Sequence, residues 1–265
     1  MDRLLSLASG TLPEFGPVAV VEAAAAAGFG GSGIWFDAAA WTEQTTRDVA
    51  AAFAATGITP LEIEVVDVKP GAPDRNHERL LESGAAIGAT DCIVVSSDPD
   101  TAAFTARFAE LCEFGAQVGI NCCLEFLPIY QLRDLPTALE VLAAVDHPRA
   151  RLLLDPLHVA RAGASIEDLS SVPRELLSFA QFCDAPAELP GERSHQTLLV
   201  EAVDGRLNPG RGGLPLRELL EVLPSELPLS LELRSRALRE RFPDPVARAR
   251  DVYVDTRAFL DAHDS

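Results

Sequence analysis

The sequence is short of basic residues. Its 265 positions hold 22 Lys and Arg against 40 Asp and Glu, which gives a formal net charge of −18. Such a chain repels nucleic acid and anionic membrane surfaces, so neither is an expected partner. No stretch approaches the roughly 20 apolar residues that a membrane span needs, and the first residues lack the basic start and long apolar core of a signal peptide. We therefore expect a cytoplasmic protein; whether it forms a homo-oligomer stays open.

Paired cysteine motifs and phosphate-binding glycine motifs are also absent. The five cysteines are an odd number, lie mostly inside apolar runs and form no C-x-x-C pair, which favours reduced, buried thiols. Neither G-x-G-x-x-G nor G-x-x-x-x-G-K-[ST] follows the first expected strand. The glycine cluster at residues 28–33 follows an expected helix, where it is interpreted as a turn.

Short apolar runs alternate with longer helical segments along the whole chain. The expected strands lie at residues 4–10, 32–36, 59–66, 91–97, 120–128, 152–155, 177–181 and 227–232. The expected helices lie at residues 15–27, 42–56, 75–87, 101–117, 135–144, 166–171, 214–223 and 245–262. Eight such units, each close to the roughly 30 residues of one βα repeat, predict an α/β fold, a (β/α)8 TIM barrel formed by a single domain over residues 1–265. An open doubly wound sheet is the alternative.

One segment interrupts the even spacing. Residues 185–213, after the seventh expected strand, are rich in proline, glycine and charge, and no regular structure is evident there. Loops of this length are commonly functional or disordered, and a loop at the C-terminal end of a barrel strand lies over the active-site face. We interpret the segment as a lid-like insertion.

Four polar residues stand near the C-terminal ends of successive strands: Glu125, Asp155, Gln181 and Glu232. Equivalent strand ends converge at one mouth of a barrel, so these side chains can meet. Three carboxylates and an amide offer hard oxygen ligands, which suit Mn²⁺ or Mg²⁺, with Co²⁺ or Zn²⁺ as further candidates. Any one of these residues alone is better explained as a hydrogen-bonded core residue or a strand-end cap, but four in phase predict a metal site.

Three further residues are candidates for contacts with a substrate. His158 lies three residues after Asp155, where it can polarise a carbonyl or hydroxyl oxygen. Asp184 lies three residues after Gln181. Glu64 alternates with apolar residues on the third strand, as does Glu62, so both can face the barrel interior.

The sequence resembles the sugar phosphate isomerase/epimerase superfamily, the xylose isomerase-like TIM barrels. This group includes hydroxypyruvate isomerases, ketose 3-epimerases, inosose and 3-dehydroshikimate dehydratases, and endonuclease IV. The matching motifs are L-E-F at Glu125, D-P-L-H from Asp155, Q-F-C-D from Gln181, D-G-R-L-N-P-G-R-G from Asp204, and L-S-L-E-L around Glu232.

The resemblance implies roles for these residues. Glu125, Asp155, Gln181 and Glu232 would hold a divalent metal, His158 would bind substrate oxygens, and Arg206 would contact the substrate from the lid. Most epimerases carry histidine where this chain has Gln181, whereas hydroxypyruvate isomerases are similar to it in having glutamine. Endonuclease IV uses several histidines and binds DNA, which does not fit a chain with five histidines and a charge of −18.

The expected function is that of a metal-dependent isomerase or epimerase of a keto-sugar or hydroxy-keto acid. Glu125 and Glu232 would remove and return a proton through an enediolate. The same residues could expel a β-hydroxyl, so a dehydratase of a keto-cyclitol is one alternative. A catalytically silent barrel that serves as a binding protein or as a subunit of a complex is the other.

Overall fold

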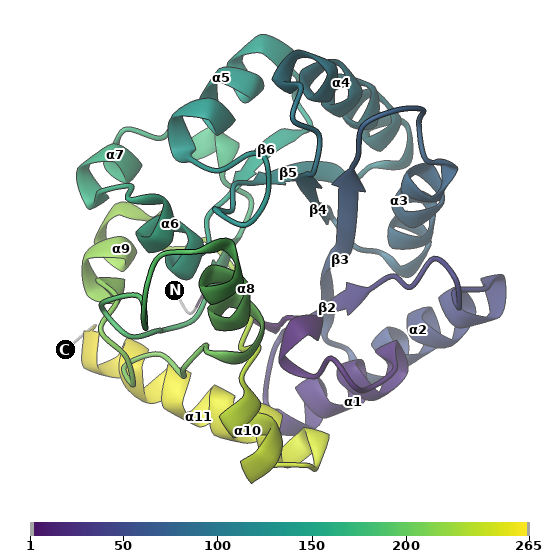
Figure 1. Cartoon of the computed structure of the whole chain (residues 1–265). Helices are drawn as coiled ribbons and strands as arrows, with labels where there is room; N and C mark the ends of the chain where they lie inside the picture. The colour runs from purple at the N-terminus through teal and green to yellow at the C-terminus, as the bar shows by residue number, and fades with distance from the viewer. Residues whose placement is uncertain (1–2, 264–265) are drawn as a thin grey trace.

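Eight parallel strands form one sheet that curves into a barrel inside a ring of helices (Figure 1). The computed structural model describes residues 3–263. The sheet order is β6-β5-β4-β3-β2-β1-β8-β7. Across the remaining gap between β6 and β7, the backbone N–H of Gln181 donates to the backbone carbonyl of Leu154 at 3.0 Å. The strands are β1 Leu5–Leu7, β2 Gly31–Trp35, β3 Thr59–Val68, β4 Asp91–Ser96, β5 Asn121–Glu125, β6 Ala150–Leu153, β7 Ala180–Phe182 and β8 Leu229–Leu231. The predicted (β/α)8 barrel is confirmed, and the open doubly wound sheet is excluded.

Most of the helices surround this barrel, and α8 (His195–Asp204) lies over its C-terminal end (Figure 1). The helices are α1 Pro17–Ala27, α2 Glu43–Thr56, α3 Arg75–Ile87, α4 Thr101–Val118, α5 Leu135–Val145, α6 Pro156–Ala162, α7 Ile166–Ser170, α8 His195–Asp204, α9 Leu216–Val222, α10 Arg236–Arg241 and α11 Pro245–His263. Helix α1 ends at Gly28, whose φ of 106° is a left-handed conformation that suits glycine. The glycine cluster at residues 28–33 therefore includes the predicted turn.

Three helices were not predicted from the sequence: α6, α8 and α10. All three are short, and each is N-capped by a side chain that accepts hydrogen bonds from the first turn: Asp155, Ser194 and Ser235, respectively. Length alone does not explain the difference, because α7 and α9 are equally short and were predicted. The expectation that residues 185–213 lack regular structure is thus wrong for the part that forms α8.

Alternate residues of the strands pack into two separate apolar clusters. The larger cluster lies between strands and helices and includes Leu124 and Leu152. The smaller one fills the barrel interior with Leu61, Ile93, Val95, Cys123, Leu127, Leu153 and Phe179. This two-residue alternation is the pattern expected for strands with helices outside and side chains inside. It places the polar residues that end the inward-facing rows at the C-terminal mouth of the barrel.

Two predictions from composition can be compared with this structure. All five cysteines are buried and none forms a disulfide, as the sequence predicted. Among residues 3–263, no helix has both the length and the apolar character required to cross a membrane.

Candidate active site

The four predicted strand-end residues meet at the C-terminal mouth. Glu125 is the last residue of β5, Asp155 follows β6 and caps α6, Gln181 lies in β7, and Glu232 directly follows β8. All four side chains are buried. When the side-chain amide of Gln181 is oriented with its nitrogen toward the two acids, it donates to Glu125 Oε1 at 3.1 Å and to Asp155 Oδ2 at 2.8 Å. Three of the four predicted ligands are therefore within hydrogen-bonding distance.

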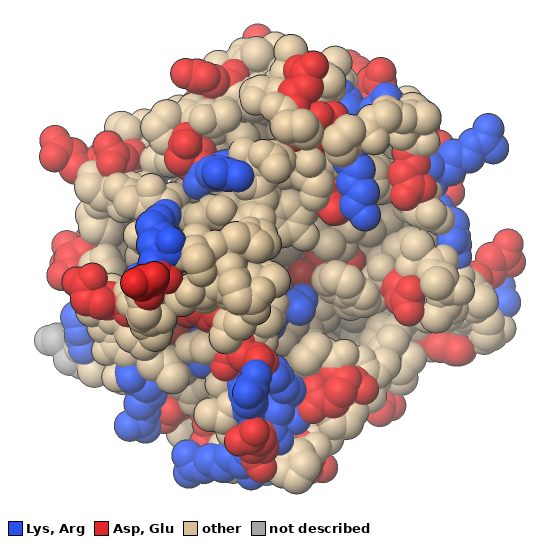
Figure 2. Space-filling view, in the orientation of Figure 1, with Lys and Arg blue, Asp and Glu red and all other residues tan. Residues whose placement is uncertain are grey.

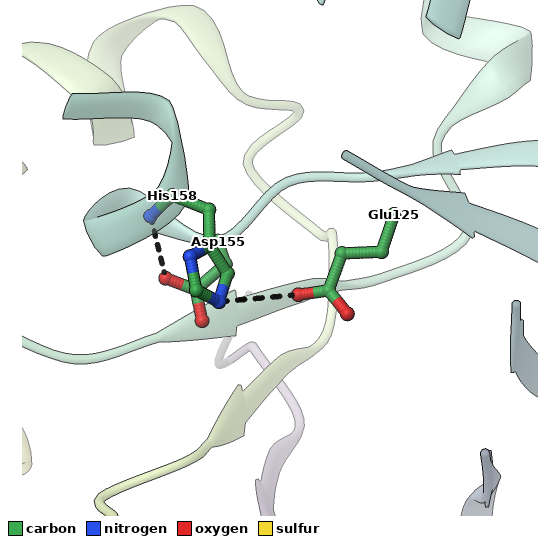
Figure 3. Close-up of side chains that lie close together, drawn as sticks. All are labelled: Glu125, Asp155 and His158. Atoms are coloured by element: carbon green, nitrogen blue, oxygen red, sulfur yellow. Dashed lines mark hydrogen bonds and ion pairs between the residues drawn. The ribbon is translucent and has the colours of Figure 1, made fainter. Parts of the chain in front are cut away.

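His158 lies beside this group, on the first turn of α6. Figure 3 shows its ring between Asp155 and Glu125, and its Nε2 is 3.9 Å from Glu125 Oε1. The ligand atoms of Glu125, Asp155 and His158 all lie within 4.8 Å of one another. Burial lowers the pKa of His158, although Asp155 opposes that shift, so its imidazole is neutral and its nitrogen can bind a cation. A cluster of this composition could hold a metal ion.

Arg206 enters the same cavity from the chain that follows α8. Its guanidinium makes an ion pair with Asp155 and another with Glu232, the latter at 2.9 Å. Its Nη2 is also 3.3 Å from His158 Nε2. The side chain is 2% exposed, so Arg206 belongs to the base of the site and touches two of the proposed metal ligands. The sequence had placed it as a substrate contact from the lid.

A second guanidinium, missed by sequence reasoning, completes the site. Arg234 Nε donates to Glu232 Oε1 at 3.0 Å, and its guanidinium carbon lies 5.6 Å from the centre of the Trp35 ring. Gly10 permits this close approach, because a Cβ there would lie 2.5 Å from Glu232 Oε1. Arg234 follows Glu232 by two residues, and side chains two residues apart in an extended chain point to the same side. This spacing is the signal from which the sequence could have placed Arg234 at the site.

Glu64 contributes a further carboxylate at the mouth. A register shift between Ile63 and Val66 interrupts the pairing of β3 with β4, and both Glu64 and Val65 line the cavity. Ser9 donates to Glu64 Oε1. Burial, together with the charge of Glu232, raises the pKa of Glu64 to about 7. The predicted placement of Glu64 at the cavity is therefore what the structure shows.

The pKa values of Glu125 and Asp155 shift in opposite directions. Burial and the neighbouring charges of Asp155 and Glu232 raise the pKa of Glu125 well above its usual range. Burial also acts to raise the pKa of Asp155, but the Arg206 guanidinium outweighs it, and the net shift is downward. Arg206 pairs with Asp155 and Glu232, whereas within residues 3–263 no guanidinium forms an ion pair with Glu125.

The charges at this site do not balance. We name the four carboxylates that meet here, Glu64, Glu125, Asp155 and Glu232, the acidic floor. Arg206 and Arg234 are the guanidiniums in ion pairs with it, and they pair with Asp155 and Glu232, so among the described residues Glu64 and Glu125 are left to be neutralised by a proton or by a further cation. Buried carboxylates without cations are costly. The residues present therefore fit a divalent metal ion, which would supply the missing charge and accept the hard oxygen ligands.

Two other predicted acids lie outside the cavity. The Asp184 carboxylate accepts hydrogen bonds from four backbone amides, those of Ala185, Gly210, Gly212 and Leu214, at 2.8 to 3.0 Å. It fixes the loop that carries Arg206 and is not among the residues that line the cavity, so its predicted contact with a substrate stays a prediction. Glu62 lies deeper in the barrel, where Ser230 donates to it and burial raises its pKa well above the usual range.

The comparison with protein families decides the classification. The model of the xylose isomerase-like TIM barrel family matches residues 21–262. The chain belongs to the xylose isomerase-like TIM barrel family. No match was found among curated protein sequences.

Solved structures of other xylose isomerase-like barrels share the fold at low sequence identity. A fusion of such a barrel with 4-hydroxyphenylpyruvate dioxygenase matches all of this chain with 20% identity and a TM-score of 0.82, and the chain spans 45% of the fusion's length. The IolI protein, solved with a bound zinc atom, has 17% identity and a TM-score of 0.82, with 98% of each chain covered. The 3-keto-D-glucoside 4-epimerase YcjR from E. coli has 19% identity and a TM-score of 0.71, covering 97% of this chain and 100% of its own.

Proposed function

We propose that this protein is a divalent-metal-dependent isomerase or epimerase that acts on a keto-sugar or hydroxy-keto acid by proton transfer. The observation that carries the proposal is the charge imbalance of the acidic floor, at the mouth where barrels of this kind place their chemistry. A site that only stabilised the fold would need no surplus of buried carboxylates. The family match and the zinc atom of the similar IolI protein support the proposal.

Glu125, Asp155, Gln181 and Glu232 would hold the metal ion. Their side chains offer oxygen ligands, and His158 adds a neutral nitrogen beside them. A bound divalent ion would polarise the substrate's oxygens and so acidify the carbon next to its carbonyl group. Mn²⁺ and Mg²⁺ suit the oxygen donors best, and the nearby imidazole keeps Co²⁺ and Zn²⁺ as candidates.

Proton transfer falls to the two glutamates, which come from different sides of the barrel. Glu125 ends β5 and Glu232 follows β8. One carboxylate takes the proton from the carbon beside the carbonyl, and the other returns a proton to the resulting enediolate. Arg206 and Arg234 hold the Glu232 carboxylate in place through their ion pairs. Arg206 Nη2 and His158 Nε2 can contact the oxygens on which charge develops.

A metal titration combined with proton exchange tests this function. Protein freed of metal by a chelator should gain several degrees in Tm on addition of Mn²⁺, because an ion that binds only the folded state stabilises it by about 3 kcal/mol at 100 times Kd. With metal present, NMR should show deuterium from D₂O entering the carbon beside the carbonyl of a ketose or hydroxy-keto acid. Loss of water from a keto-cyclitol without such isomerisation would indicate the dehydratase. No thermal shift and no exchange would indicate the silent barrel.

A further inference from the structure

The active-site cavity has a polar base and an apolar wall. Its volume is about 180 Å³. Its charged lining consists of Glu64, Glu125 and Glu232 of the acidic floor, with Arg206 and Arg234. Aliphatic side chains, which we call the apolar wall, line much of the rest: Val65, Ile93, Val95, Leu127, Ile129 and Leu199. Figure 2 shows the hollow at the centre of this face, bordered mainly by uncharged residues, with acidic and basic groups visible inside it.

The apolar wall is continuous with the barrel interior. Ile93, Val95 and Leu127 belong to the inner apolar cluster, and Val65 and Ile129 pack against it. Helix α8 adds Leu199 and Val203 from above. A hydroxyl group placed against this wall would lose its hydrogen bonds to water and find aliphatic carbon in their place. Tyr130 is the wall residue that carries a hydroxyl.

The apolar character continues beyond the site. A second cavity of about 500 Å³ shares Trp35 and Arg234 with the first, and it is lined by Leu12, Phe15, Val20 and Trp41 as well. Trp35 is 44% exposed, an unusual state for the largest aromatic side chain, and it lies under the Arg234 guanidinium. An exposed aromatic ring at the border of two cavities offers a surface for a planar or aliphatic group.

We propose that the substrate is a hydroxy-carbonyl compound with an apolar substituent, and not a free polyhydroxylated sugar. This inference rests on the proposed function and narrows its substrate class. The hydroxy-carbonyl head lies on the acidic floor beside His158 and Arg206. The apolar tail lies along the aliphatic wall and reaches the Trp35 ring at the border of the second cavity.

A matched pair of small ketones tests the tail directly. The probes are 1-hydroxybutan-2-one and erythrulose, which have the same four-carbon skeleton and the same hydroxyketone head and differ by two hydroxyl groups on the tail. 2-Hydroxyacetophenone, with the same head and a phenyl tail, is the third probe. Binding in Mg²⁺ buffer can be followed by tryptophan fluorescence, because both tryptophans of the chain, Trp35 and Trp41, line the second cavity.

We expect 1-hydroxybutan-2-one to bind at least about tenfold more tightly than erythrulose, since each hydroxyl without a partner costs roughly a tenfold factor or more. The phenyl probe should bind more tightly again. Val203→Thr adds a hydroxyl to the wall at nearly constant shape. It should bring the dissociation constants of 1-hydroxybutan-2-one and erythrulose closer together. Val200→Thr on the same helix is the matched control, because Val200 is 44% exposed and lies outside this cavity, and it should leave the ratio of the two dissociation constants unchanged.

The outcomes separate this inference from the proposed function. The inference of an apolar tail would be overturned if erythrulose bound as tightly as 1-hydroxybutan-2-one or more tightly, or if millimolar 2-hydroxyacetophenone gave no fluorescence response. If the ketones bind in the expected order but none exchanges its proton with D₂O, the proposed reaction fails while the tail-binding inference stands. Exchange of erythrulose with the higher kcat/KM would support the reaction and refute the tail.

Discussion

Two buried arginines close to α8 stand in opposite electrostatic situations. Arg161, at the end of α6, makes a two-pronged ion pair with Glu201 of α8 at 2.8 and 2.7 Å, and it also donates to the carbonyls of Pro186 and Ala187. We call Arg161 and Glu201 the anchor pair. Arg206 instead lies among the carboxylates of the acidic floor, which outnumber the guanidiniums in contact with them.

The two clusters show that charged side chains can be buried either to stabilise the fold or to serve a function. The anchor pair is balanced, and its hydrogen bonds tie α8 and residues 186–187 to the barrel. The acidic floor is unbalanced, and surplus buried charge is justified only by a further cation or by chemistry. The segment at residues 185–213 thus combines a fixed helix with the arginine that reaches the site. The following changes test whether the two clusters really differ in this way.

Breaking the anchor pair should have the largest effect on stability. Arg161→Met leaves Glu201 buried without its cation, and removal of one partner of a buried pair costs about 3–5 kcal/mol. Urea denaturation with a fluorescence readout measures the loss. Arg211→Met is the control, because the Arg211–Asp255 pair is largely exposed and should contribute less than about 1 kcal/mol. Equal losses in the two variants would refute the anchoring role.

Neutralising the glutamates of the acidic floor should instead abolish activity. Glu125→Gln and Glu232→Gln keep the shape but remove the proton-transferring carboxylate, so kcat should fall on the order of 10²-fold or more. Stability in metal-free protein should be unchanged or higher for Glu125→Gln, because Glu125 has no guanidinium partner among the described residues, whereas Glu232→Gln also loses the ion pairs with Arg206 and Arg234 and should lower it. Glu201→Gln should show the reverse, with stability lost and a smaller loss of kcat. A near-normal rate in Glu232→Gln would refute the two-glutamate mechanism.

Arg206→Met should affect both substrate use and metal affinity. We expect kcat/KM to fall by a factor that corresponds to about 1.5–3 kcal/mol of lost transition-state stabilisation, the value of a charge-assisted hydrogen bond. Because Arg206 contacts Asp155 and Glu232, its removal should free two ligands from a competing cation and tighten Mn²⁺ binding, which calorimetry can measure. Weaker Mn²⁺ binding would show that Arg206 positions the ligands.

The smallest expected effect concerns the pH dependence of stability. The raised pKa of Glu64, about 7, means that the folded protein binds a proton that the unfolded chain releases near pH 4.5. The stabilisation from Glu64 is therefore complete below pH 4.5 and is lost as the pH rises through 7.

Glu64→Gln should remove this dependence. In metal-free protein at pH 8, the variant should be more stable than the parent by on the order of 1–3 kcal/mol, and the two should converge near pH 4.5. Thermal denaturation across this pH range measures the difference. A gap that stays constant with pH would show that Glu64 does not titrate in this window.

The sequence was most informative where elements are long and periodic. Helix α3 was predicted with its observed bounds, Arg75–Ile87, because it is long and its ends are marked by Asp74 and Gly88. Helix α8 was missed, since only Leu198, Glu201 and Ala202 of its ten residues are buried, and one of these is charged. What holds it in place is the pairing of Glu201 with Arg161, forty positions away, which no local pattern reveals.

The site divides along the same line. The repeated strand–helix period and the polar residues that end the inward-facing rows determined the barrel and the meeting of Glu125, Asp155, Gln181 and Glu232, because equivalent strand ends converge in such a fold. Only the tertiary structure decided how charges pair at the mouth. It placed Arg206 and Arg234 on the acids, turned Asp184 to the backbone of its own loop, and brought aliphatic side chains into the same cavity as the acidic floor. Ion pairs and cavity walls depend on contacts between residues far apart in the chain, and these contacts exist only after the barrel has closed.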